Sequence, residues 1–176
     1  ASTAATGSIA LTTVSANGNA VISLGSGSGS FAIVGGNPGL SFETLGTFTL
    51  DASKFGGTVD VQNISSSGAN SITIAGNGDF SAGAINSAST FTLDANNATS
   101  GVVTLTSLSA GGAISIDMGA GSGSVTLTDV EADGAFTLDG TGYLGNLAVN
   151  SLSASGAATI IMSSGNTTIS ALNADS

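Results

Sequence analysis

Apolar and small polar residues alternate along most of the chain, and the alternating stretches recur after about 22 residues. A period of two is the spacing of a β-strand with one buried face, so each stretch predicts a short strand. The first apolar set of each unit is Ile9/Leu11/Val14, Leu40/Phe42/Leu45, Val59/Val61/Ile64, Phe80/Ala82/Ile85, Val103/Leu105/Leu108, Val125/Leu127/Val130 and Leu147/Val149/Leu152.

A second apolar pair follows each first set after a turn. The pairs are Val21 or Ile22 with Leu24, Phe48/Leu50, Ile72/Ile74, Phe91/Leu93, Ile114/Ile116, Phe136/Leu138 and Ala158/Ile160. The sequence FTLD begins at positions 48, 91 and 136, which are 43 and 45 residues apart, or about two units. We therefore expect these three phenylalanines to share one interior column with Ile72 and Ile114. The turn between the two strands carries Gly18, Gly68, Gly112, Gly134 and Gly156, which suit a tight corner or a positive φ.

One such unit cannot fold alone, because its few buried side chains do not offset the entropy of ordering the chain. Stacked units can pair their backbones and cover one another's apolar faces. The repeat therefore predicts an all-β protein, a parallel β-solenoid (β-helix) of about seven to eight coils with about 22 residues each. We expect a single domain over residues 1–176. The segment ALNADS at 171–176 repeats only the first half of a unit. Either the chain is a fragment of a longer repeat protein, which we favour, or a neighbouring molecule completes the stack.

The regular pattern is interrupted over residues 31–46, FAIVGGNPGLSFETLG. Two strand-like stretches lie close together there around Pro38, the only proline. We expect an irregular coil or a loop that bulges from the stack.

Charge limits the possible partners. The chain has 11 acidic side chains and one basic side chain, Lys54, and its formal net charge is −10. Such a surface repels phosphate groups, so we expect no nucleic-acid partner, and cations are the natural partners. No apolar run approaches ~18 residues, so we expect no transmembrane segment. The absence of Cys excludes disulfides and thiolate metal sites.

Aspartates follow the second strand of several units. Asp51, Asp94, Asp117 and Asp139 occupy this place, and the last three fall in consecutive units. Carboxylates stacked ~4.8 Å apart repel one another, and Ca²⁺, which prefers several oxygen ligands, would relieve this repulsion. The alternative is that each Asp is solvated at a strand end and accepts backbone N–H bonds in an Asx-turn.

A second acidic cluster lies in DVEADGAFTLDG at 129–140. Asp129, Glu131 and Asp133 occupy alternate positions before Gly134, as at the start of a calcium loop of the form D-x-[DN]-x-[DN]-G. The acid expected at the twelfth position is absent, and the equivalent turns hold Ser or Gly. A Ca²⁺ ligand set and a solvated acidic turn both remain open for this cluster.

Hydroxyl side chains form a file beside the second apolar pairs. Its members are Ser23, Thr49, Thr73, Thr92, Ser115, Thr137 and Thr159. They alternate with buried positions and should face outward. Regular Thr arrays occur in ice-binding solenoids, but β-branched hydroxyl residues also suit any exposed strand.

The segment PGLSFETLGTFTLDASKFGGTVDVQNISSSGANSITIAGNG at 38–78 resembles repeats of bacterial surface-layer and type I-secreted, calcium-associated (RTX-like) proteins. The residues that carry the resemblance are Phe42, Glu43, Thr44 and Leu45. The resemblance implies a secreted β-solenoid of a bacterial cell surface, associated with Ca²⁺.

The chain has few side chains that commonly carry out catalysis, because it contains no His, Cys, Arg or Trp. We therefore expect that it is not an enzyme. The favoured function is a structural component of a secreted, extracellular surface layer or filament. Its partners would be copies of itself, and outer-surface polysaccharide held through calcium. The alternative is the stalk of a bacterial adhesin.

Overall fold

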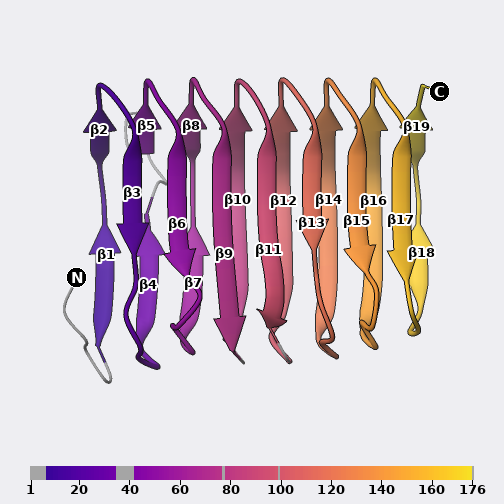
Figure 1. Ribbon diagram of the computed structural model, residues 1–176, viewed down its shortest axis with the longest axis horizontal. Helices are drawn as coiled ribbons and strands as arrows, with labels where there is room; N and C mark the ends of the chain where they lie inside the picture. The colour runs from indigo at the N-terminus through magenta and orange to yellow at the C-terminus, as the bar shows by residue number, and fades with distance from the viewer. Residues whose placement is uncertain (1–6, 35–41, 77, 99, 176) are drawn as a thin grey trace.

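The computed structural model describes residues 7–34, 42–76, 78–98 and 100–175. The chain forms two parallel β-sheets (Figure 1). The two sheets enclose one apolar core. The first sheet has 12 strands: β1 (Ser8–Leu11), β2 (Val14–Ala16), β4 (Ser30–Ile33), β5 (Phe42–Thr44), β7 (Thr58–Val61), β8 (Ile64–Ser66), β10 (Phe80–Ser87), β12 (Val103–Ala110), β14 (Ser124–Ala132), β16 (Asn146–Ala154), β18 (Thr167–Ile169) and β19 (Leu172–Ala174). The second sheet has 7 strands: β3 (Ala20–Ser23), β6 (Phe48–Ala52), β9 (Asn70–Gly76), β11 (Phe91–Ala98), β13 (Ile114–Asp117), β15 (Phe136–Gly140) and β17 (Ala158–Met162).

Each strand pairs in parallel with the equivalent strand of the next coil. Val103, Val125 and Leu147, for example, are in register at intervals of 22 residues. We number the coils by their strand in the second sheet, so that coil one contains β3 and coil seven contains β17. The chain makes about seven turns of roughly 22 residues, which confirms the predicted parallel β-solenoid.

Strand alternation separates an apolar interior from a polar exterior. In β15, Phe136, Leu138 and Gly140 are buried, whereas Thr137 and Asp139 are partly exposed. The same alternation holds on the other side of the core, where Val125 and Leu127 of β14 are buried. Each coil therefore covers the apolar side chains of its neighbours, as the stacking argument requires.

The second coil does not use the apolar set expected for it. Phe31 and Ile33 take the first two interior positions, in register with Val59 and Val61. Phe42 occupies the third, between Val14 and Ile64, and Leu45 is 68% exposed. The expected set of Leu40, Phe42 and Leu45 is therefore wrong at Leu45 and in the place given to Phe42. Leu40 and Pro38 lie outside the described residues.

The third coil also differs from the expected register. Asn70, and not Ile72, lies in the column of Phe48 and Phe91, and Ile72 is in register with Leu50 and Leu93. Asn70 is 1% exposed, and its Oδ1 atom has no hydrogen-bond partner among the described residues. The prediction was wrong because it aligned the most apolar residues of each strand.

Glycines form two columns at the turns. The first contains the predicted Gly134 and Gly156, which have ordinary φ values. A Cβ added at Gly134 would lie 2.9 Å from the Ala113 nitrogen, so close approach of the coils, and not a positive φ, requires glycine here. The second column was not predicted from the sequence; its members are Gly29, Gly57, Gly78, Gly123, Gly145 and Gly165. A Cβ at each would overlap the carbonyl oxygen of the equivalent glycine one coil earlier.

We expect Gly123→Ala to destabilise the stack by about 1–3 kcal/mol, because its Cβ would overlap the Gly101 carbonyl oxygen and lie 2.8 Å from the Gly101 carbon. Gly18→Ala is the matched control, since no heavy atom lies within 4 Å of a Cβ added there. Thermal and urea unfolding should show a lowered stability for Gly123→Ala alone. Equal stability of the two variants would contradict the role of the second glycine column.

Candidate functional site

The outer face of the second sheet carries two parallel columns of polar side chains. We call the first the hydroxyl column; its members are Val21, Thr49, Ser71, Thr92, Ser115, Thr137 and Thr159. We call the second the acidic column; its members are Ser23, Asp51, Thr73, Asp94, Asp117, Asp139 and Ile161. The expected hydroxyl file was therefore wrong at Ser23 and Thr73, which lie in the acidic column.

Three aspartates of the acidic column are stacked in consecutive coils. Asp94 is in register with Asp117, and Asp117 with Asp139. Adjacent strands in a sheet lie ~4.8 Å apart, so the three backbones are close. Asp51 is separated from them by Thr73 of coil three.

Each aspartate of the acidic column also caps the turn that follows it. Oδ1 of Asp94 accepts the N–H of Asn96 at 3.0 Å, Oδ1 of Asp117 that of Gly119 at 3.1 Å, and Oδ1 of Asp139 that of Thr141 at 2.9 Å. Asp51 accepts the Ser53 N–H in the same way at 3.0 Å. These bonds are Asx-turns, so the aspartates have a local structural role.

Asp117 makes one further bond that joins two coils. Its Oδ2 atom accepts the Nδ2–H of Asn96 at 2.6 Å. Both carboxylate oxygens of Asp117 are therefore engaged with the chain. Asn96 belongs to β11 and was not identified as a site residue from the sequence, because a single amide side chain is not a signal of a site.

Hydrogen bonds favour the charged form of two of the aspartates. The side chain and then the backbone N–H of Thr141 lower the pKa of Asp139 below its ordinary value of 3.8. The side chain and backbone of Ser53, with a smaller contribution from Lys54, lower the pKa of Asp51. Both carboxylates are therefore charged in the folded protein at neutral pH.

The second acidic cluster lies mostly on a strand. Asp129 and Glu131 belong to β14 and face outward on either side of buried Val130, and Asp133 follows the strand. The expectation that these acids lie on a turn is wrong for Asp129 and Glu131. An extended strand spreads alternate side chains along one face, whereas a calcium loop curves them toward one point.

Within the described part of the chain, no three acidic side chains are grouped so that they could hold a metal ion. The carboxylates of the acidic column offer the hard oxygen atoms that Ca²⁺ prefers, but their Oδ1 atoms are directed at their own turns. One molecule alone therefore does not fit a Ca²⁺ ion at these residues. Calcium binding stays a prediction, which would require ligands from a second molecule.

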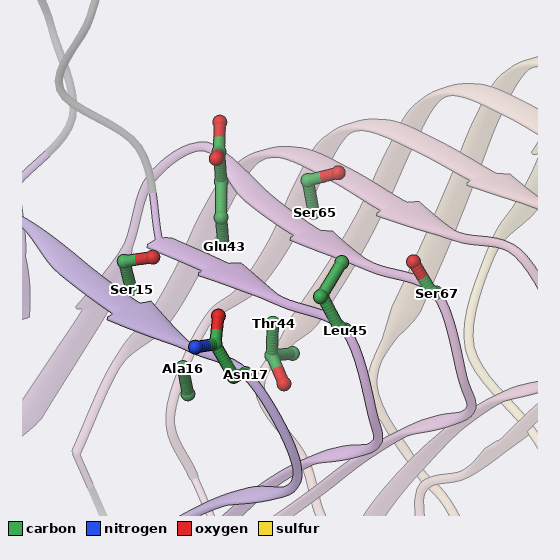
Figure 2. Close-up of a pocket in the computed structure, with 8 residues that line it drawn as sticks. All are labelled: Ser15, Ala16, Asn17, Glu43, Thr44, Leu45, Ser65 and Ser67. Carbon is green, nitrogen blue, oxygen red and sulfur yellow. The ribbon is translucent and has the colours of Figure 1, made fainter.

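A hollow of about 230 Å³ lies on the outer surface of the first three coils. Its lining residues are Ser15, Ala16, Asn17, Glu43, Thr44, Leu45, Ser65 and Ser67 (Figure 2). Glu43 of β5 is in register with Ser15 and Ser65 of the neighbouring strands. The hollow thus offers hydroxyl and carboxylate oxygens beside the exposed Leu45. Before the structure, Glu43 was identified only as part of a resemblance, because the three strands come together only in the stack.

Comparison with family models, with curated proteins and with solved structures finds no match for this chain. No helix among the described residues is long and apolar enough to cross a membrane.

Because folding lowers the pKa values of Asp51 and Asp139, the stability of the folded protein depends on pH in the acid range. A carboxylate whose pKa is depressed on folding stabilises the protein above its unfolded value, near 3.8, and this contribution is lost as the pH falls through the folded pKa. We expect the Tm to fall in this range, and Asp139→Asn, which keeps an acceptor oxygen but does not titrate, to reduce the fall. Thr141→Val should reduce it in part. An equally steep fall in Asp139→Asn would contradict this assignment.

Proposed function

We propose that this chain is a structural β-solenoid segment of a secreted bacterial surface-layer or extracellular-filament protein, and that it associates laterally with copies of itself. The supporting observation is the outer face of the second sheet, on which the hydroxyl column continues from coil two to coil seven and an aspartate recurs in each of coils four to six. A face with a regular repeat can make the same contact many times with an equally regular partner.

Charge is the main obstacle to such association. With a net charge of −10, two copies repel each other unless cations gather between them. Oδ1 of Asp94 and Asp139 accepts one N–H bond each, and a carboxylate has about four lone-pair positions. Calcium would then bridge carboxylates of two facing molecules, and the same bridge would serve outer-surface polysaccharide.

We expect the purified chain to form sheets or fibres on addition of calcium and to disperse when a chelator is added. Electron microscopy and light scattering measure this directly. Magnesium is the control ion, because it keeps its water ligands more firmly and demands octahedral geometry. A chain that stays monomeric with and without calcium would contradict the proposal and would favour an adhesin stalk.

Two charge-matched variants locate the contact. The combined variant Asp94→Asn, Asp117→Asn and Asp139→Asn keeps an acceptor oxygen in each turn and removes three charges from the acidic column. We expect it to lose calcium-dependent assembly while it remains folded by circular dichroism.

The matched control removes three charges on and beside β14 of the other sheet through Asp129→Asn, Glu131→Gln and Asp133→Asn. This variant should assemble like the parent. If it lost assembly to the same extent, general charge and not the acidic column would control association.

A further inference from the structure

The strands of the second sheet alternate strictly between two packing patterns. Coils two, four and six carry Phe, then Leu, then Ala or Gly at their three buried positions, and we call these Phe-type coils. Coils one, three, five and seven carry Ile in the middle and Leu, Ile or Met in the third position, and we call these Ile-type coils. The Phe-type sets are Phe48/Leu50/Ala52, Phe91/Leu93/Ala95 and Phe136/Leu138/Gly140, and the Ile-type sets are Ala20/Ile22/Leu24, Asn70/Ile72/Ile74, Ile114/Ile116/Met118 and Ala158/Ile160/Met162.

Large and small side chains alternate along the column of third positions, whereas the first column holds Phe91, Ile114 and Phe136 in succession and the middle column holds only Ile and Leu. Phe136 lies between Ile114 and Ala158, and Phe48 lies between Ala20 and Asn70. At the third position, small Ala52 is in register with large Ile74, and Gly140 with Met162. Protein interiors are close-packed, so two large residues in succession would overfill the third column, and two small ones in succession would leave a void.

The contact between coils six and seven shows how closely the two types fit. A Cβ added at Gly140 would lie 2.7 Å from the Sδ atom of Met162 and 3.4 Å from the Cβ of Tyr143. Met162 and Tyr143 therefore occupy the space that the small third residue of a Phe-type coil leaves. Phe136, Leu138 and Tyr143 are almost completely buried by this arrangement.

The far edge of β17 has no partner strand among the described residues. Ala158, Ile160 and Met162 pack against the core on one side only and remain partly exposed. In the preceding coils the core-facing residue donates its N–H to the following coil, as Phe136 does to the Ala157 oxygen. By the same pattern, the N–H groups of β17's core-facing residues are directed toward this open edge.

We infer that the open edge of β17 is a docking surface for a parallel strand of the Phe type, with Phe, Leu and then Ala or Gly at alternate positions. Phe would cover Ala158, Leu would cover Ile160, and the small residue would leave room for Met162. This continues the contact that coil six already makes on the other side of β17. The inference rests on core packing and is independent of the proposed surface function.

The first coil of a second copy does not fit this edge. It is an Ile-type coil, so it would place Ala20 on Ala158 and Leu24 on Met162. The first contact leaves a void and the second overfills the column. Head-to-tail joining of two such stacks is therefore disfavoured, and the partner is a strand of the other type.

Extension of the chain tests the inference. Ala174 is in register with Ala154, and Ala154 with Ala132, so a segment added after Ser176 begins in line with Ala135. One extended chain carries a copy of residues 135–146, a Phe-type segment, and another carries an equally long copy of residues 113–124, an Ile-type segment. We expect the Phe-type extension to raise the Tm and to slow hydrogen exchange of the Ala158 and Ile160 amides by about tenfold or more. The Ile-type extension should do neither.

A control of identical composition separates fit from hydrophobicity. In it, the copies of Phe136 and Gly140 within the Phe-type extension are exchanged, which puts the large residue on Met162 and the small one on Ala158. We expect this extension to leave the β17 amides unprotected. The inference is overturned if the exchanged or the Ile-type extension protects β17 as well as the Phe-type one, or if the Phe-type extension gives no protection.

Discussion

The rest of the structure depends on the spacing of ~4.8 Å between successive coils, which the backbone ladder sets. At this distance equivalent positions form continuous columns, and each side chain must fit the residues directly before and after it. Gly123 shows the constraint in its strictest form, because a Cβ there would overlap the Gly101 carbonyl oxygen. Small residues at the turns are therefore a condition of stacking, which explains a composition with 27 glycines in 176 residues.

The sequence could predict the architecture because the period of two and the repeat of about 22 residues are both local patterns. Register in the irregular coils could not be predicted in the same way. In coil three, local hydrophobicity favours Ile72 in the phenylalanine column, but the structure puts Asn70 there and Ile74 beside Ala52. A shift of two residues would put Gly76 beside Ala52 and leave a void, whereas the observed register fills this place with Ile74 and buries the amide of Asn70.

The candidate site, too, could be predicted only in part from the sequence. That Asp94, Asp117 and Asp139 are stacked follows from counting along the repeat, and the register agrees. Their hydrogen bonds could not be predicted in this way, because the donors differ in sequence and place. Asn96 lies within β11, whereas Gly119 and Thr141 follow β13 and β15. The hollow beside Glu43 could not be predicted either, because its lining residues come from three coils that meet only in the stack.

Interior packing also sets the spacing of the outer chemistry. In every Phe-type strand an aspartate follows the leucine, as Asp51 follows Leu50 and Asp139 follows Leu138. Because Phe-type coils alternate with Ile-type coils, this rule alone would place aspartates ~9.6 Å apart, at twice the strand spacing. Asp117, in an Ile-type coil, fills one gap, and its second oxygen is held by Asn96 of the coil before. The densest charge therefore lies over coils four to six, where the amide of Asn96 offsets part of the repulsion that the added carboxylate creates.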